Sequence, residues 1–137
     1  MASDEPTTLP TTEDEWRVRL SPAEFRVLRQ AGTEAPWSGE YVDTKAAGTY
    51  ECRACGAQLY NSDTKFDSHC GWPSFDDAIP GAIKEINDFT MGMARTEIRC
   101  ARCDSHLGHV FRGEMMTAKN TRHCVNSLSI KLDPDQA

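Results

Sequence analysis

Two Cys-x-x-Cys pairs constrain the fold of this chain more than any other feature of its sequence. They occur in YECRACGAQLY (50–60) and IRCARCDSHLGH (98–109), so each pair lies between segments that read as strands. A Cys-x-x-Cys turn presents two thiolates on one side, and two such turns can surround one ion tetrahedrally. The sequence therefore predicts one Zn²⁺ ion held by Cys52, Cys55, Cys100 and Cys103.

The predicted ion has a structural role, because four protein ligands leave no open coordination position on a tetrahedral zinc. Since residues 56–99 separate the two pairs, the ion has to join distant parts of the chain. Iron is a chemically possible alternative to zinc. Two thioredoxin-like redox pairs are another alternative, but the flanking pattern lacks the strand–helix–strand setting of such motifs.

Composition and charge limit the classes of partner. The chain of 137 residues is long enough for one domain with a core. No apolar run approaches the roughly 20 residues of a membrane helix, and the acidic start lacks the basic and apolar parts of a signal peptide. A net charge of −6 disfavours nucleic acid and anionic membranes. We therefore expect a cytoplasmic protein whose six cysteines serve metal or redox chemistry.

Two short helices are predicted near the N-terminus, over residues 12–20 and 21–32, after a flexible tail at 1–12. In the second helix, Ser21 and Glu24 form a Ser-x-x-Glu capping box that fixes the start. Gly32 is the residue expected to end this helix.

The rest of the chain reads as short strands separated by turn signals. The expected fold is mainly β: an antiparallel β domain, clipped by the two Cys-x-x-Cys turns, with the short helices at its N-terminus. Residues 13–134 form one domain in this interpretation, and 135–137 form a C-terminal tail. The strands are predicted over 48–52, 57–61, 82–86, 95–100, 106–111, 123–127 and 128–132.

Two histidines follow the second cysteine pair. On a regular strand His106 and His109 would lie near opposite faces, because side chains alternate. Gly108 between them suggests a bulge that would bring both to one side. Two ordinary surface or core histidines are the simpler interpretation unless a nearby group needs a proton.

Two further cysteines are not needed for the metal, and each directly follows a histidine. Arg122 and His123 precede Cys124, and Asn126 follows it on the same predicted strand face. Positive neighbours favour the reactive thiolate, and the Asn126 amide can donate to an oxygen near the sulfur. A small buried side chain is the alternative interpretation of Cys124.

Cys70 lies in SHCGWPSF (68–75), whose Gly-Trp-Pro sequence predicts a surface loop. A loop cysteine can approach a second thiol, as a resolving cysteine must. Trp72 either offers a flat apolar face to a ligand or anchors the loop, and the residues alone leave both interpretations open.

Together these motifs resemble the B-type methionine sulfoxide reductases, the family that reduces methionine-R-sulfoxide. The similarity runs from about Trp16 to Leu132 and includes GTEAPWSGEY (32–41). The resemblance implies an oxidoreductase that repairs oxidised methionine, free or in proteins. The motifs that carry it are CRAC, SHCGWPSF, CARC, HLGHVF and RHCVNS.

For the cysteines, the resemblance implies a two-thiol cycle. Cys124 matches the nucleophile, which attacks the sulfoxide sulfur and keeps the oxygen as a sulfenic acid. Cys70 matches the resolving cysteine, which forms a Cys70–Cys124 disulfide. Thioredoxin is the reductant that the family implies, and we expect a monomer with one zinc ion.

The resemblance also assigns the residues of the pocket. His106 and His109 match residues that protonate and position the sulfoxide oxygen, with His109 preferred as the acid. Asn126 would hold the oxygen or the thiolate, and Trp72 would cover the substrate methyl group. Arg122, beside the nucleophile, is assigned to substrate binding.

The sequence departs from the usual family pattern beside both redox cysteines, where His69 replaces a glycine and His123 a tyrosine. The main alternative function is a redox-switched zinc-binding regulator that uses the same cysteine pair without a sulfoxide substrate. A zinc-ribbon binding module would leave Cys70 and Cys124 idle. A zinc deaminase would need an open ligand position and an H-x-E string, which the sequence lacks.

Overall fold

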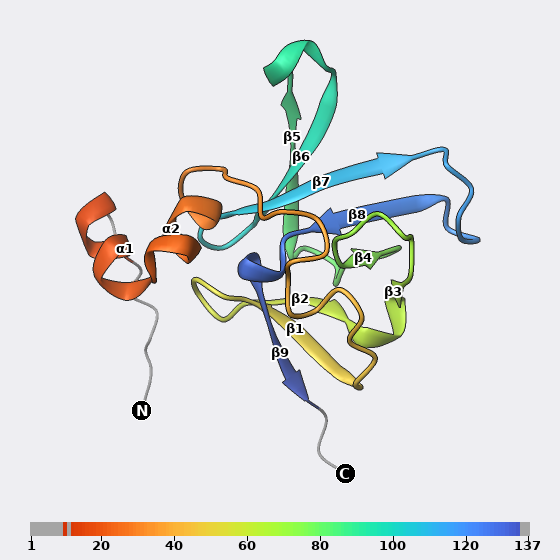
Figure 1. Ribbon diagram of the computed structural model, residues 1–137, viewed down its shortest axis with the longest axis horizontal. Coiled ribbons are helices and arrows are strands. Elements are labelled where there is room, and N and C mark those ends of the chain that lie inside the picture. The colour runs from red at the N-terminus through yellow and green to blue at the C-terminus, as the bar shows by residue number, and fades with distance from the viewer. Residues whose placement is uncertain (1–9, 11, 135–137) are drawn as a thin grey trace.

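Two β-sheets and two short helices form the structure, a computed structural model that describes residues 10 and 12–134 (Figure 1). The mainly β fold with short N-terminal helices is confirmed. The tails predicted at 1–12 and 135–137 lie outside the described residues, apart from positions 10 and 12. None of the described helices is long and apolar enough to cross a membrane.

Both predicted helices form, and each begins at a capping box. Helix α1 spans Glu13–Arg19 and α2 spans Pro22–Leu28. In α2 the Ser21 hydroxyl accepts from the backbone N–H of Glu24 at 3.1 Å, and the Glu24 carboxylate accepts from the backbone N–H of Ser21 at 2.9 Å. Such a cap contributes on the order of 1 kcal/mol, which is enough to fix where the helix begins.

The predicted helix end at Gly32 is wrong. Helix α2 ends at Leu28, and the residue in left-handed conformation beyond it is Ala31, with φ of 55°. The N–H of Gly32 donates to the Arg26 carbonyl at 2.9 Å. A Cβ at position 32 would lie 2.8 Å from that oxygen, so glycine is required by a close approach after the helix.

The strands form two antiparallel sheets. The smaller has the order β2-β1-β9 and the larger the order β3-β4-β8-β7-β6-β5. In Figure 1 the β5–β6 hairpin rises at the top and the helices lie at the left. The strands are β1 Gly48–Cys52, β2 Gln58–Asn61, β3 Lys65–Phe66, β4 Ser74–Phe75, β5 Ile83–Asp88, β6 Arg95–Cys100, β7 His106–Arg112, β8 Thr121–Val125 and β9 Ile130–Pro134.

Seven of the nine strands match predicted ones. Strands β1 and β6 have the predicted bounds, and β2, β5 and β7 differ by one or two residues at an end. Strands β8 and β9 are separated by a 3₁₀ helix, η4 (Ser127–Ser129), which carries the chain from the larger to the smaller sheet. Strands β3 and β4 were not predicted, because two residues carry no periodicity.

The core lies where the two sheets pack against each other. Tyr50 and Tyr60 from the smaller sheet and Phe75 from the larger one are fully buried. The ring centroids of Tyr60 and Phe75 are 4.3 Å apart in a stacked arrangement. Helix α2 adds Phe25 and Leu28 to the same cluster. This packing holds β8 firmly at the centre of the larger sheet.

His123 belongs to this core. Its ring lies against Tyr60, with Nδ1 3.0 Å from the tyrosine hydroxyl, and the residue is 5% exposed. Because side chains alternate along β8, His123 and Cys124 face opposite sides of the sheet. Burial first, and then the charge of Arg112, lowers the pKa of His123 to about 4. The expectation that a positive His123 favours a Cys124 thiolate is therefore wrong.

We expect the neutral, buried His123 to weaken the fold in mild acid. The unfolded chain binds a proton at this residue below pH 6.5, whereas the folded chain binds it only below about pH 4. Between these values the unfolded state holds the extra proton, so the free energy of unfolding falls as the pH falls, by roughly 2–3 kcal/mol at pH 4.5. Urea unfolding at pH 7 and pH 4.5 measures this loss, which His123→Phe reduces.

His69→Asn is the matched control. The His69 side chain is 80% exposed, and asparagine tolerates its φ of 60°. This variant keeps the wild-type pH dependence. Acid also affects the four-cysteine cluster, but equally in the wild type and both variants. The quantity to compare is therefore the difference between the three proteins in how much unfolding free energy they lose from pH 7 to pH 4.5. An unchanged pH dependence in His123→Phe would contradict the neutral buried ring.

Candidate active site and metal centre

The two Cys-x-x-Cys turns meet, although they belong to different sheets. One joins β1 to β2 and the other joins β6 to β7, and they lie close together near α2 in Figure 1. The sulfurs of Cys52 and Cys103 are 3.6 Å apart, as are those of Cys55 and Cys100. All four sulfurs lie within 4.8 Å of one another. The predicted ligand set is therefore brought together.

The geometry of this cluster fits a tetrahedral ion. Four sulfurs at about 2.3 Å from a zinc ion would be about 3.8 Å from one another, close to the 3.6 Å that separates the sulfurs in each of the two pairs named above. Three of the cysteines are buried and Cys55 is partly exposed. The cluster can hold one metal ion, and a set of four thiolates leaves no position on a tetrahedral ion for a substrate.

A bulge in β7 brings the two predicted histidines together. Ile98 pairs with Gly108 and the next residue, Arg99, pairs with His106, so β7 carries one extra residue at this point. The ring centroids of His106 and His109 are 5.7 Å apart. The bulge suggested by Gly108 is confirmed, and both imidazoles line the same cavity.

His106 is hydrogen-bonded to a carboxylate that sequence reasoning missed. Its Nδ1 lies 2.7 Å from Glu97, which also accepts two hydrogen bonds from Arg99. Burial raises the pKa of Glu97, but the bonds from Arg99 and His106 outweigh it and lower the pKa. Burial lowers the pKa of His106 more than Glu97 raises it. His106 is thus neutral at pH 7, with Nδ1–H donated and Nε2 left as an acceptor.

His109 is paired with a second missed carboxylate through its other ring nitrogen. Its Nε2 lies 2.7 Å from Asp88. The hydrogen bond from His109, followed by those from the Thr90 N–H and hydroxyl, holds the pKa of Asp88 well below its usual range. Asp88 is therefore an ionised acceptor for Nε2–H, which leaves Nδ1 of His109 for a ligand.

The two remaining cysteines face each other. His109 on β7 pairs directly with Cys124 on β8, so both side chains lie on one face of the sheet. Ser74 on β4 pairs with Cys124 from the other side and places the preceding loop, with Cys70, over β8. The sulfurs of Cys70 and Cys124 are 3.8 Å apart, and the Ser68 hydroxyl donates to Cys70 at 3.0 Å.

The contact between the sulfurs shifts the pKa values of the two thiols in opposite directions. The hydrogen bond from Cys124, aided by Ser68 and Ser74, lowers the pKa of Cys70 to about 4 although burial raises it. The same contact and burial raise the pKa of Cys124, and Arg122 offsets only part of this. The contact between the sulfurs therefore lowers the pKa of Cys70 rather than that of Cys124, the thiol for which the sequence suggested a thiolate.

Glu34, another residue that sequence reasoning missed, connects two predicted site residues. Its carbonyl accepts from the Trp72 indole N–H at 3.0 Å, and its backbone N–H donates to Asn126 Oδ1 at 3.0 Å. Its buried carboxylate accepts from the backbone N–H groups of Ser127 at 2.9 Å and Leu128 at 3.0 Å. Glu34 lies in GTEAPWSGEY, a segment included in the family resemblance, and this was the one sequence feature that could have pointed to it.

Asn126 does not lie on the same strand face as Cys124. Strand β8 ends at Val125, and Asn126 begins the turn into η4. One amide hydrogen of Asn126 is donated to the Leu107 carbonyl at 3.2 Å. The side chain is thus oriented by backbone groups on two sides, and its second amide hydrogen is left for the cavity.

Arg122 lies at the edge of the site and is held there by two contacts. Its Nε donates to Glu114 at 2.8 Å, and its guanidinium lies over the Phe111 ring at 4.5 Å from the centroid. Its side chain is 12% exposed. Both contacts orient the positive charge beside Cys124.

One cavity of about 200 Å³, which we call the sulfur pocket, collects the predicted chemistry. Aromatic, thiol and imidazole groups converge in it from β7, β8 and the loop before β4. Its lining includes all predicted site residues outside the metal cluster: Cys70, Trp72, His106, His109, Arg122, Cys124 and Asn126.

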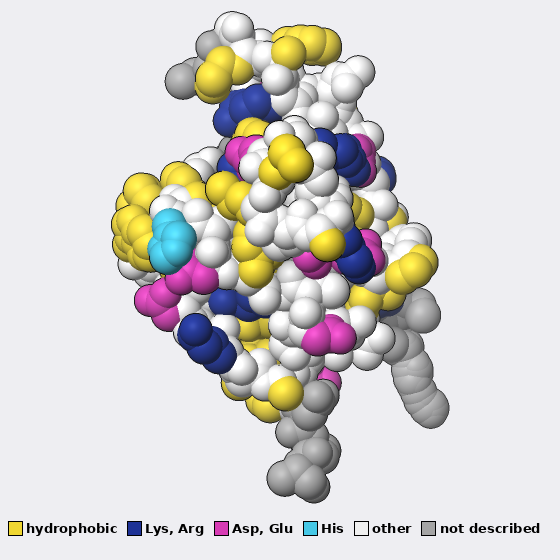
Figure 2. All heavy atoms as spheres, turned by 90° about the vertical axis from the view of Figure 1, so that its right-hand side faces the viewer, with side chains coloured by type: hydrophobic (Ala, Val, Ile, Leu, Met, Phe, Trp, Pro, Cys, Tyr) yellow, Lys and Arg dark blue, Asp and Glu magenta, His cyan; other side chains and the backbone are white. Residues whose placement is uncertain are grey.

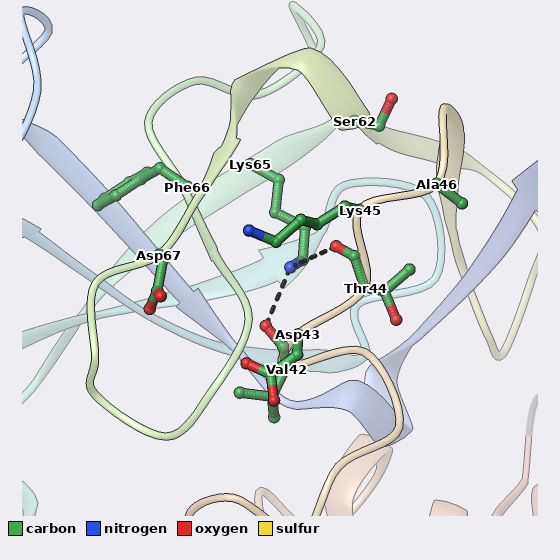
Figure 3. A pocket seen from close by; sticks show the side chains of 9 residues that line it. All are labelled: Val42, Asp43, Thr44, Lys45, Ala46, Ser62, Lys65, Phe66 and Asp67. Atoms are coloured by element: carbon green, nitrogen blue, oxygen red, sulfur yellow. Dashed lines mark hydrogen bonds between the residues drawn. The ribbon is translucent and has the colours of Figure 1, made fainter.

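A cavity of about 330 Å³ elsewhere contains none of these residues (Figure 3). It lies between residues 42–46 and the segment 62–67. Lys65 crosses it and donates to the carbonyl oxygens of Val42 at 3.0 Å and Thr44 at 2.9 Å. This lysine fixes a loop to β3, which is a structural role.

We expect Glu34→Gln to loosen the sulfur pocket. Glutamine replaces one acceptor oxygen by an amide group that faces a backbone N–H. The free energy of unfolding should fall by about 1–3 kcal/mol, and the Trp72 indole N–H should exchange faster with solvent. Urea unfolding and hydrogen exchange followed by NMR measure the two effects.

Glu40→Gln is the control for this prediction. Glu40 lies in the same loop and pairs with Arg53 at 2.8 Å, but its side chain is 60% exposed, so its loss costs less than about 1 kcal/mol. Equal effects of the two substitutions would contradict the role assigned to the buried carboxylate of Glu34.

Comparisons with known proteins agree with this geometry. The SelR domain family matches residues 20–134. "Peptide methionine sulfoxide reductase MsrB" of Leifsonia xyli subsp. xyli is 51% identical over 125 residues, 90% of each chain. The protein of that name from Acinetobacter baylyi is 53% identical over 127 residues, 91% of this chain and 90% of its own. "Peptide methionine sulfoxide reductase B2, chloroplastic" of Arabidopsis thaliana is 52% identical over 136 residues, 98% of this chain and 66% of its own.

The matched segment contains both Cys-x-x-Cys turns and every residue of the sulfur pocket. The family match over residues 20–134 therefore confirms the resemblance inferred from the sequence motifs. The chain belongs to the SelR domain family, that of the B-type methionine sulfoxide reductases.

Proposed function

We propose that this enzyme reduces methionine-R-sulfoxide to methionine with the Cys70–Cys124 pair. The observation that carries the proposal is one pocket in which two thiol sulfurs lie 3.8 Å apart beside two histidines with carboxylate partners. The names of relatives more than 50% identical support this type of substrate. The preference for the R epimer follows from membership of the B-type family.

The first step transfers the sulfoxide oxygen to Cys124. Its sulfur attacks the sulfoxide sulfur and forms a sulfur–sulfur bond. This bond and the sulfur–oxygen bond of the substrate then break as the oxygen moves to the Cys124 sulfur, which becomes a sulfenic acid while methionine leaves. Because Cys124 is a thiol before the reaction, its proton has to be removed. The Cys70 thiolate at 3.8 Å accepts it, so Cys70 acts first as a base.

His109 is the acid that protonates the sulfoxide oxygen. His106 presents only an acceptor, because its Nδ1–H is donated to Glu97. His109 has Nε2–H on the ionised Asp88, so its protonated form donates from Nδ1. His106 then accepts a hydrogen bond from the hydroxyl group that results.

The other pocket residues bind and orient the substrate. Trp72, fixed by its indole N–H, covers the methyl group of the sulfoxide with its ring. Asn126 donates its second amide hydrogen to the sulfoxide oxygen. Arg122 supplies a positive charge at the rim, where it favours negative charge on the sulfurs.

The second step closes the disulfide. The Cys70 thiol, protonated in the first step, attacks the sulfenic sulfur of Cys124, a sulfur–sulfur bond forms, and water leaves. Since a disulfide bond is about 2.05 Å long, the sulfurs need to approach by less than 2 Å from their separation of 3.8 Å. We propose thioredoxin as the dithiol that reduces this disulfide through a mixed disulfide.

The four-cysteine cluster has a structural role in this proposal, with Zn²⁺ as its ion. Zinc prefers tetrahedral thiolate sites, and the sulfur distances support this choice. We further propose that residues 13–134 form a single reductase domain that acts as a monomer in the cytoplasm, where thiols are kept reduced.

Single-turnover assays of pre-reduced protein with separate R and S epimers of a methionine sulfoxide peptide test this function. We expect about one methionine per chain, from the R epimer only, together with a Cys70–Cys124 disulfide seen by mass spectrometry. Cys70→Ser should give at most one methionine and then stop in the presence of thioredoxin. Cys124→Ser should give none.

Each alternative has its own outcome in this assay. Undiminished turnover of Cys70→Ser with thioredoxin would show that another group resolves the sulfenic acid. A disulfide that forms with peroxide, without methionine from either epimer, would favour the redox-switched regulator.

We expect removal of the metal to unfold the protein. A structural zinc site contributes about 10–16 kcal/mol of binding free energy, which is comparable to the whole stability of a domain, about 5–15 kcal/mol. Metal analysis should find one zinc ion per chain, and a chelator should abolish the near-ultraviolet circular dichroism. Cys100→Ser should lose the ion and Cys124→Ser should keep it. A metal-free protein with an unchanged melting temperature would contradict this role.

A further inference from the structure

A larger cavity lies beside the sulfur pocket. It has a volume of about 710 Å³ and lies between the β5–β6 hairpin and the residues after α2. We call it the hairpin groove. Thr33, Arg95, His106 and His109 line both cavities, so the two meet at the histidines. A ligand whose sulfoxide occupies the sulfur pocket can therefore continue into the groove.

The sizes of the two cavities suggest different roles. The sulfur pocket, at about 200 Å³, is below the roughly 300–1,000 Å³ of pockets that enclose a drug-sized molecule, and it suits a single side chain. The hairpin groove, at about 710 Å³, is within that range. A free amino acid bound at Cys124 would leave most of the groove empty.

Apolar side chains line the hairpin side of the groove. Ile86, Phe89 and Met93 contribute to it. Phe89 is 70% exposed and Met93 is 48% exposed, although both are large hydrophobic residues. Figure 2 shows exposed hydrophobic side chains at the top of the molecule, the end that the β5–β6 hairpin occupies in Figure 1. Uncovered apolar side chains next to a reactive pocket are typical of a binding surface.

The charged side chains of the groove already have partners. Asp88 accepts from His109 and lies 3.6 Å from Arg95. Glu97 is bonded to both His106 and Arg99. A charged ligand would have to displace one of these pairs, whereas an apolar side chain would leave them intact. The groove therefore favours a neutral, apolar occupant.

We propose that the hairpin groove binds an apolar side chain two positions from the methionine sulfoxide in a protein substrate. In an extended peptide, residues two positions apart point to the same side, so one side chain can enter the sulfur pocket while another enters the groove. Phe89 and Met93 are then specificity residues. This inference rests on the proposed reductase function, since it concerns the substrate of the same pocket.

Peptides that differ only in the residues two positions before and two positions after the methionine sulfoxide test the proposal. One peptide carries leucine at these two positions and the other serine, and N-acetylmethionine sulfoxide amide is the small reference substrate. The wild-type enzyme should have a kcat/KM about tenfold higher for the leucine peptide than for the serine peptide. In the double variant Phe89→Ser, Met93→Ser this ratio should fall to below about twofold, because kcat/KM falls for the leucine peptide and stays the same for the serine peptide.

The control is the double variant Val18→Ser, Met115→Ser, whose original side chains are 90% and 82% exposed and do not line the groove. It should keep the tenfold ratio. Equal kcat/KM values for the two peptides in the wild type would overturn the inference while leaving the reductase function intact. Methionine from none of the three substrates would instead refute the function itself.

Two further outcomes would also overturn the inference. An equal loss on all three substrates in the Phe89→Ser, Met93→Ser variant would show that the hairpin acts through Asp88 and the histidines. A raised KM for thioredoxin with an unchanged peptide ratio would show that the groove receives the reductant.

Discussion

The close approach of β7 to β8 at Gly108 is the constraint on which the site depends. A Cβ at this position would overlap the carbonyl oxygen of Cys124 and lie 2.9 Å from Cα of Val125, so another residue would push the strands apart. The bulge at the same place turns His106 to the side of His109, and the register then sets His109 directly opposite Cys124. One glycine therefore aligns both imidazoles with one sulfur.

The four-cysteine cluster supports this alignment from a distance. It joins the turn after β1 to the turn before β7, and His106 lies only three residues beyond Cys103. The start of β7 is thus fixed by the cluster, and its middle is fixed by β8. In the proposed mechanism the cluster has no part in the chemistry, but the position of the histidines depends on the strand that it holds. Stability and reactivity are connected through β7.

Short-range patterns in the sequence predicted most of the fold and the members of the site. The cysteine spacing, the capping box at Ser21 and the glycine between the histidines are local patterns, and each predicted a feature that the structure contains. The carboxylates Asp88 and Glu97 could not be found in this way, because their importance comes from partners across the sheet. The lowered pKa of Cys70 likewise depends on the contact between two sulfurs whose residues are 54 positions apart in the chain. Because side chains alternate along a strand, assigning Cys124 to the pocket was enough to predict that His123 faces the other side of the sheet.

The short distance between the sulfurs of Cys70 and Cys124 also bears on how well Cys124 resists irreversible oxidation. The sulfenic acid that the proposed mechanism forms on Cys124 has two fates: attack by a thiol, or further oxidation by peroxide to a sulfinic acid that thiols do not reverse. A thiol held at 3.8 Å reacts with an effective concentration far above that of any diffusing oxidant. In the proposed cycle disulfide formation thus wins this competition, and Cys70 shields Cys124 from permanent oxidation.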